Sequence, residues 1–158
     1  WPPVVMMLGI LILILSGSFM VGKGYGSACA TWPLCEGDFF PEGVAFATHM
    51  GHRYLTVIVG LLIVGTVIWT LRRKEESPGV DAANAALVVY LVVQILFGAA
   101  VVWSGFASEF KGLHLSLATL TWMVGSYLLA VMLVPVKFQS TKSGPPKTFI
   151  SEVPESTG

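Results

Sequence analysis

Four long stretches of this sequence carry almost no charged side chain, and this distribution limits the fold more than any single motif. They cover residues 2–22, 43–71, 82–108 and 112–136. The only Asp, Glu, Lys, Arg or His residues inside them are His49, His52, Arg53 and His114. Each stretch is longer than the roughly 20 residues that an α-helix needs to cross the core of a bilayer. We therefore predict four transmembrane helices.

The composition supports this prediction. Charged residues make up 11% of the chain, whereas a typical soluble domain contains about 25%. Nine Lys and Arg balance nine Asp and Glu, so the chain has no basic excess with which to bind nucleic acid. Four such hydrophobic helices in 158 residues would leave too little polar chain to enclose them in a water-soluble core.

The predicted fold class is an all-α membrane protein, a four-transmembrane-helix bundle within a domain that covers residues 1–136. The apolar residues do not alternate as they would in strands of a membrane barrel. The helices are expected at about residues 2–21, 44–71, 82–106 and 112–136, with a long loop at 22–43. Residues 137–158 are rich in Ser, Thr, Pro, Lys and Glu, which predicts a flexible tail. The first helix is too long for the apolar region of a signal peptide, and because the chain begins at Trp1 we expect residues before it.

The basic residues predict the orientation. Six lie between the second and third helices or in the tail, namely Arg72, Arg73, Lys74, Lys137, Lys142 and Lys147. The first and third loops contain only Lys23 and Lys111. Because Lys and Arg accumulate on the cytoplasmic side, both termini are predicted to be cytoplasmic. The first and third loops are then extracytoplasmic, in a multi-pass protein of the plasma membrane.

Both cysteines of the chain, Cys29 and Cys35, lie in the first loop. An outward-facing loop is in an oxidising compartment, where a disulfide persists. The short spacing, which includes a proline, allows a small ring and favours a structural disulfide. Two free thiols and a redox-active pair are the alternatives, although redox pairs usually have the spacing Cys-x-x-Cys.

All three histidines lie within the predicted helices, where polar residues are costly and usually functional. His49 and His52 are near the outer start of the second helix, three residues apart and so on roughly one face. His114 is near the outer start of the fourth helix, which runs in the same direction. His52 and His114 are therefore expected at similar depth, where two imidazoles can bind a haem iron from opposite sides. The alternatives are histidines that only pack, and a zinc site, for which the same helical faces offer no carboxylate or thiolate.

The neighbouring residues suit a flat, partly anionic ligand. Small residues follow the two histidines along their helices, namely Thr56, Gly60, Ala118, Thr121 and Gly125. Arg53 and Lys111 lie near the outer surface, where haem propionates would point, although Arg53 can also extend to lipid headgroups. Close contacts between helices are expected at Gly9, Gly17, Gly60, Gly65 and Gly98.

Several motifs resemble those of the heme A synthase family. Residues 26–37 read Gly-Ser-Ala-Cys-Ala-Thr-Trp-Pro-Leu-Cys-Glu-Gly. This segment resembles the family's extracytoplasmic loop, in which Gly-Ser-Gly-x-x-Cys precedes Trp-Pro-Leu-Cys-x-Gly. His52-Arg53 resembles the family's His-Arg pair, and residues 113–119 resemble its fourth-helix histidine segment. The resemblance covers about residues 17–125.

The resemblance implies a reaction and a set of ligands. Heme A synthases convert haem O to haem A by oxidising a porphyrin methyl group to a formyl group, and they carry haem b as a cofactor. By resemblance, His52 and His114 are the axial ligands of the iron, and Cys29 and Cys35 form the loop disulfide. The family has two similar four-helix halves, of which this chain matches one. A second copy, or a partner in a respiratory complex, would complete the eight-helix body.

One position departs from the family pattern. Heme A synthases usually have Glu three residues before the helix-two histidine, in Glu-x-x-His-Arg, and this chain has His49 there. An imidazole can accept and release protons near neutral pH, so His49 is the expected catalytic residue. The alternative function is a non-catalytic bis-histidine haem b subunit or assembly partner of a respiratory membrane complex. A thiol redox protein is a third possibility, for which the cysteine spacing is unsuitable.

Overall fold

A computed structural model of the chain describes residues 1–73 and 78–133, and in these ranges it contains four α-helices and no strand. The helices are α1 (Pro2–Gly22), α2 (Val44–Arg72), α3 (Pro78–Trp103) and α4 (Ser108–Leu133). All four are long and apolar enough to cross a membrane. The predicted all-α, four-helix membrane fold is therefore confirmed. The predicted tail, residues 137–158, lies outside the described residues.

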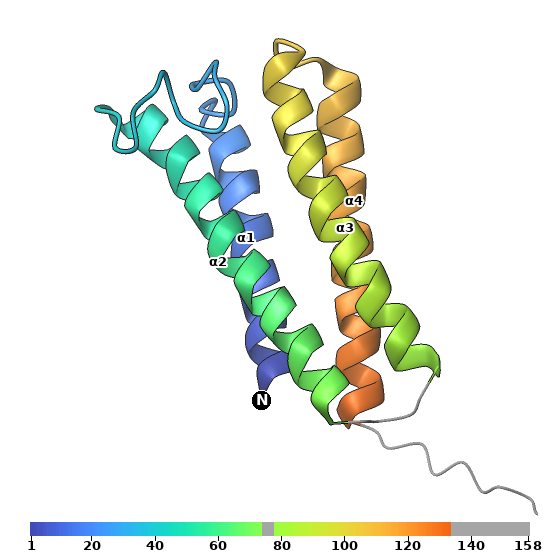
Figure 1. Ribbon diagram of the computed structural model, residues 1–158. Helices are drawn as coiled ribbons and strands as arrows, with labels where there is room; N and C mark the ends of the chain where they lie inside the picture. The colour runs from blue at the N-terminus through green and yellow to red at the C-terminus, as the bar shows by residue number, and fades with distance from the viewer. Residues whose placement is uncertain (74–77, 134–158) are drawn as a thin grey trace, which may run out of the picture.

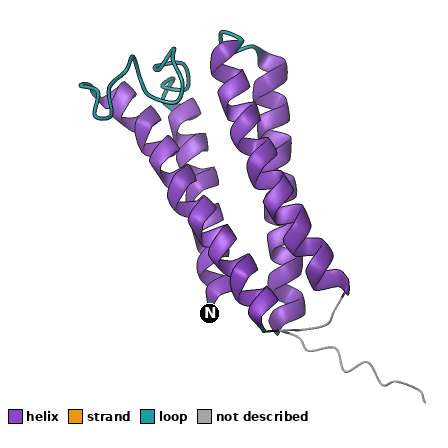
Figure 2. Ribbon diagram, viewed as in Figure 1, coloured by secondary structure: helices purple, strands orange, loops and turns teal. Residues whose placement is uncertain are grey.

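The four helices form two antiparallel hairpins, α1 with α2 and α3 with α4 (Figure 1). One end of the molecule, called the loop end from here on, carries the long loop 23–43 and the short turn 104–107 (Figure 2). The N-terminus lies at the opposite end. The hairpins are closer together near the N-terminus and farther apart toward the loop end.

The helices of the second hairpin begin earlier than the charge pattern predicts. α3 begins at Pro78 instead of residue 82, with proline at the first helical position and Asp81 in the first turn. α4 begins at Ser108 instead of residue 112, with Glu109 in its first turn. Proline and acidic residues both suit a helix N-terminus. Charges that marked the ends of the apolar stretches thus lie inside the first turns of the helices.

The main apolar core joins the two hairpins in the half of the bundle away from the loop end. All four helices contribute to it, with Met6, Met7, Ile10, Val59, Ile63, Val80, Ala83, Leu87 and Leu128. Many side chains on the outer faces, such as Leu8, Leu61 and Val92, are more than half exposed. An apolar exterior of this kind is what lipid-facing helices present.

Several of the glycines expected at close contacts between helices are found there. A Cβ at Gly9 would lie 3.0 Å from Cδ1 of Leu62, and one at Gly60 would lie 3.5 Å from Cδ1 of Leu91. The prediction of a close helix contact is wrong for Gly65, because nothing lies within 4 Å of its Cβ position. Gly125, expected beside a ligand, instead packs on α1, where its Cβ would be 2.7 Å from Sδ of Met7.

Candidate functional site

His52 and His114 lie in the half of the bundle nearer the loop end, on the two helices that run in the same direction. His52 is in the third turn of α2, and His114 is in the second turn of α4. Both side chains are partly buried. The main apolar core lies nearer the opposite end, so these polar rings lie beyond its packed residues.

His52 rests against α1 through two consecutive residues. Ser16 Oγ lies 2.8 Å from Nδ1 of His52, and the same hydroxyl donates to the carbonyl oxygen of Leu13 at 2.7 Å. The next residue, Gly17, faces the ring, so that a Cβ there would lie 3.2 Å from Cε1. No hydrogen bond joins Nε2 of His52 to another described residue.

His114 rests against α3 in a similar way. Gln94 Nε2 lies 3.5 Å from Nε2 of His114, and a Cβ at Gly98 would lie 3.2 Å from Cε1 of the ring. Two buried polar atoms of this pair, Nδ1 of His114 and Oε1 of Gln94, have no hydrogen-bond partner among the described residues. Buried polar atoms without partners are rare and indicate a site for water, an ion or a ligand.

Each hairpin therefore builds its histidine site from the same parts. Its second helix supplies the histidine, and its first helix supplies one polar side chain and one glycine. Ser16 and Gln94 were missed by the sequence analysis. The signal was available, because both are polar residues inside long apolar segments, where polar residues usually have a function.

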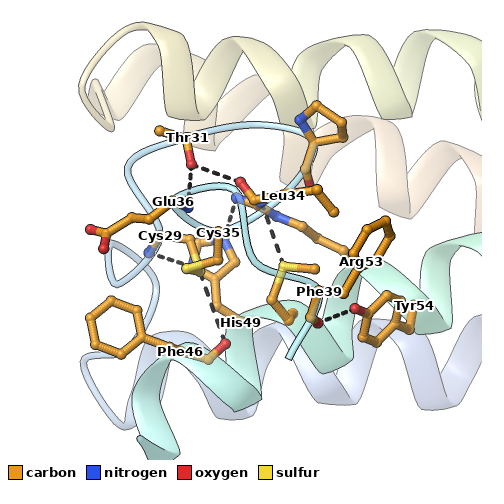
Figure 3. Close-up of a disulfide and its surroundings, with 12 residues drawn as sticks. Cys29, Thr31, Leu34, Cys35, Glu36, Phe39, Phe46, His49, Arg53 and Tyr54 are labelled. Atoms are coloured by element: carbon orange, nitrogen blue, oxygen red, sulfur yellow. Dashed lines mark hydrogen bonds between the residues drawn. A yellow bond between two sulfur atoms is a disulfide. The ribbon is translucent and has the colours of Figure 1, made fainter. Parts of the chain in front are cut away.

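His49 lies below the disulfide loop, and its contacts are with that loop and its own helix (Figure 3). The backbone N–H of Cys29 donates to Nδ1 of His49 at 3.3 Å. Nη2 of Arg53 lies 3.5 Å from Nε2, and the side chain is only 5% exposed. His49 and His52 were expected on roughly one face of the helix. Their rings nevertheless have different partners, because His49 contacts the first loop and His52 contacts α1.

Arg53 is bound to the first loop. Its Nη1 donates to the carbonyl oxygen of Pro33 at 2.9 Å, and the same nitrogen lies 3.8 Å from Sδ of Met50. Lys111, the other predicted propionate contact, places Nζ 5.8 Å from the centre of the Phe106 ring. Neither position tests a propionate contact, which stays a prediction.

The first loop is a small folded unit closed by a disulfide between Cys29 and Cys35. The predicted structural disulfide is present, and the chain has no other cysteine. Both cysteines are buried and pack against Met50 of α2. Across the ring, the Thr31 hydroxyl donates to the Leu34 carbonyl oxygen at 2.7 Å and accepts from the Glu36 backbone N–H (Figure 3). The loop is thereby fixed on top of α2.

The loop also reaches the second hairpin. The rings of Trp32 and Trp103, which ends α3, meet edge to face with their centres 5.6 Å apart. On the other side, the Tyr54 hydroxyl donates to the carbonyl oxygen of Phe39 (Figure 3). The loop thus connects both hairpins at the end of the bundle nearer the histidines.

The described residues offer a pair of imidazoles and no larger cluster. Within residues 1–73 and 78–133, no three His, Cys, Asp or Glu side chains gather where they could hold one metal ion. A structural zinc ion would usually need four protein ligands. A haem iron takes its in-plane ligands from the porphyrin, so one or two histidines suffice. The donor set of His52 and His114 therefore fits haem better than zinc.

Comparison with known proteins finds heme A synthases among the similar sequences. The chain is 30% identical to a heme A synthase of Alkalihalophilus pseudofirmus, over 84% of this chain and 44% of the relative. It is also 30% identical to a heme A synthase of Shouchella clausii, over 92% of this chain and 47% of the relative. A protoheme IX farnesyltransferase of Halobacterium salinarum is 32% identical over 70% of this chain and 25% of the relative. No solved structure matches the chain.

The chain spans a little under half the length of the heme A synthases that it resembles. Residues 42–150 match the COX15-CtaA family, described as cytochrome oxidase assembly protein. This range begins just before α2 and continues past α4, so it contains both His52 and His114. Because the match covers more than half of the sequence, this multi-pass membrane protein belongs to the cytochrome oxidase assembly family of heme A synthases and related haem-processing proteins.

Proposed function

We propose that this protein binds haem b between its two hairpins and acts as a heme A synthase, oxidising the methyl group of haem O to the formyl group of haem A. The observation that carries the proposal is the position of His52 and His114 near the same end of two co-directional helices, one in each hairpin. Family membership supports the same assignment. The position of the main core toward the opposite end supports a ligand site in the half that contains the histidines.

His52 and His114 would hold the iron of this haem, one from each hairpin. If bound there, haem b would supply one-electron chemistry, and the residues that bind its iron would tune that chemistry. Gly17 and Gly98 leave space beside the two imidazoles, since a side chain at either position would crowd the ring at 3.2 Å. Arg53 and Lys111 are the proposed partners of the propionates, and Arg53 already holds the loop above this region.

His49 is the proposed proton-transferring residue. It occupies the position where heme A synthases usually have glutamate. Its Nδ1 accepts from the Cys29 backbone N–H, and Nη2 of Arg53 lies 3.5 Å from its Nε2. His49 lies nearer the start of α2 than His52, and therefore nearer the loop end. To transfer a proton, the His49 ring would have to give up its contact with Cys29 or with Arg53 during the reaction.

The proposed location is the plasma membrane, with the loop end outside the cytoplasm. The positively charged residues Arg72 and Arg73 lie at the opposite end of the described bundle, as expected for a cytoplasmic side. The disulfide lies at the loop end, in agreement with an oxidising compartment. Because the chain spans a little under half of its relatives, we propose that it associates with a second copy or with a partner of a respiratory complex.

Co-expression with a source of haem O tests the proposed reaction. Extracted pigments are expected to contain haem A when the wild-type chain is present, and no haem A when His52→Ala or His114→Ala replaces it. Bound haem b without any haem A would contradict the synthase proposal and favour the non-catalytic haem b subunit. His49→Glu, which restores the usual family residue, is the companion variant. It is expected to keep or increase haem A formation, whereas His49→Leu is expected to abolish it.

A further inference from the structure

We infer that Ser16 is a positioning residue that fixes the tautomer of His52, leaving Nε2 as the nitrogen that can bind iron. The inference rests on the proposed haem site, although it concerns two side chains whose contacts are described directly. Neither the family motifs nor the spacing of the histidines points to Ser16.

The direction of the hydrogen bonds follows from the chemistry of the three groups. Ser16 Oγ lies 2.7 Å from the carbonyl oxygen of Leu13 and 2.8 Å from Nδ1 of His52. A carbonyl oxygen can only accept, and a hydroxyl has a single hydrogen to donate. Both contacts are hydrogen bonds only if the hydroxyl donates to Leu13 and accepts from Nδ1–H of His52. A neutral imidazole has one N–H, so Nε2 then carries the free lone pair.

The surroundings strengthen this preference. In the core of a membrane no water competes for the groups, and an unsatisfied polar atom is costly. If the hydroxyl instead donated to Nδ1, it could not donate to the carbonyl oxygen of Leu13, and that contact would be lost as a hydrogen bond. Gly17, directly after Ser16, lets the ring lie close to α1, because a Cβ would come within 3.2 Å of Cε1. Ser16 thus holds the ring through one bond, and Gly17 provides the space for it.

The tautomer of the second histidine, His114, is not fixed in the same way. Gln94 carries both an amide NH₂ and a carbonyl oxygen, so turning its amide lets it donate to a ring nitrogen or accept from an N–H. Its contact with Nε2 of His114 is also longer, at 3.5 Å. Gln94 is therefore compatible with either tautomer of His114. Of the two neighbouring residues, only Ser16 selects one tautomer of its histidine.

A hydrogen bond to the far nitrogen of an axial histidine makes the ligating nitrogen a better electron donor and stabilises ferric iron. Removing such a partner usually costs about 10–100-fold in metal affinity. We expect Ser16→Ala to weaken ferric haem binding relative to ferrous by about tenfold, which raises the midpoint potential by about 59 mV for a one-electron couple. The low-spin spectrum should persist, because His52 and His114 both remain.

Two variants serve as controls in a redox titration of the haem-loaded full chain. Ser16→Thr keeps a hydroxyl that can still donate to a carbonyl one turn earlier, so it should retain the wild-type potential. Ser18→Ala makes the same chemical change at an exposed position of the same helix, and should leave the potential unchanged. Equal potentials for Ser16→Ala and Ser18→Ala would overturn the inference and reduce Ser16 to a packing residue.

A second readout separates this inference from the haem proposal. In chain labelled with ¹⁵N-histidine, the imidazole shifts report which nitrogen carries hydrogen, and His49→Gln and His114→Gln identify the signals of His52. We expect the Nδ1–H form in the wild type and a mixture of both forms in Ser16→Ala. An Nε2–H form in the wild type would contradict the role of Ser16, with or without haem. A wild-type chain that binds no haem but shows Nδ1–H would refute the haem proposal alone.

Discussion

At the scale of single residues, His52 and His114 are each backed by a glycine. Gly17 faces His52 and Gly98 faces His114, and in both cases an added Cβ would lie 3.2 Å from Cε1 of the ring. Such a distance requires the ring to move by a few tenths of an ångström. A ring held on its other side by an iron would have little freedom to do so.

Gly17→Ala and Gly98→Ala are therefore expected to reduce haem binding. Overpacking usually costs about 1–3 kcal/mol, so haem affinity should fall by about tenfold or more. Gly22→Ala and Gly65→Ala are the matched controls in α1 and α2, because nothing lies within 4 Å of their Cβ positions. Haem content per purified protein measures the effect. Equal content in all four variants would show that the ring positions do not matter for the ligand.

Substitutions of His49 test whether its contacts hold the first loop in place. His49→Leu would leave the Cys29 N–H without its acceptor, and an unsatisfied buried group costs about 1–3 kcal/mol. His49→Glu keeps an acceptor for Cys29 and adds a charge that Arg53 can pair with. We expect lower thermal stability in detergent for the first variant and wild-type stability or better for the second. The opposite order would mean that these contacts do not hold the loop.

The depth of the histidines could be predicted from the sequence, but the pairing of each histidine with its polar neighbour could not. His52 and His114 are prominent because charged or polar groups are rare in apolar segments, and the direction of the helices gives their depth. Ser16 and Gln94 become partners only once the helices are paired and their rotations are set, which charge gaps do not determine. The contact of Arg53 with Pro33 could not be predicted either, because the path of the loop depends on local contacts.

At the scale of elements, the first loop, residues 23–43, joins the two hairpins at the end of the bundle nearer the histidines. It is attached to α2 through Arg53 and His49, and it touches the end of α3 through Trp32 and Trp103. Its motif predicted a disulfide, whereas the contact between the tryptophans could not be predicted. The two residues are far apart in sequence, and no pattern links them.

Replacing both Cys29 and Cys35 with Ala is expected to loosen the loop while the helices persist. A ring of this size restricts the unfolded chain by about 2 kcal/mol. Hydrogen exchange should increase in residues 23–43 and at the start of α2, with little change in the middle of α3 and α4. Arg53→Ala should give a weaker version of the same pattern, because it removes only one attachment. Unchanged exchange in the loop of the double variant would show that its other contacts are sufficient.

At the scale of the whole molecule, the distribution of charge predicted the helix number and order, because a bilayer accepts few charges and only fully hydrogen-bonded backbone. The same rule misplaced the starts of α3 and α4, since Asp81 and Glu109 lie within first turns. How the hairpins meet also had to come from the structure. The main core occupies the half away from the loop end, and the two histidines lie in the other half.

The absorption spectrum of the purified protein tests the central claim, that His52 and His114 together hold a haem between the hairpins. The wild type is expected to show a low-spin, b-type haem spectrum when reduced. His52→Ala and His114→Ala should each lose that spectrum, while Ser18→Ala, at an exposed position of α1, should keep it. A colourless wild-type protein, or an unchanged low-spin spectrum in both histidine variants, would contradict the claim.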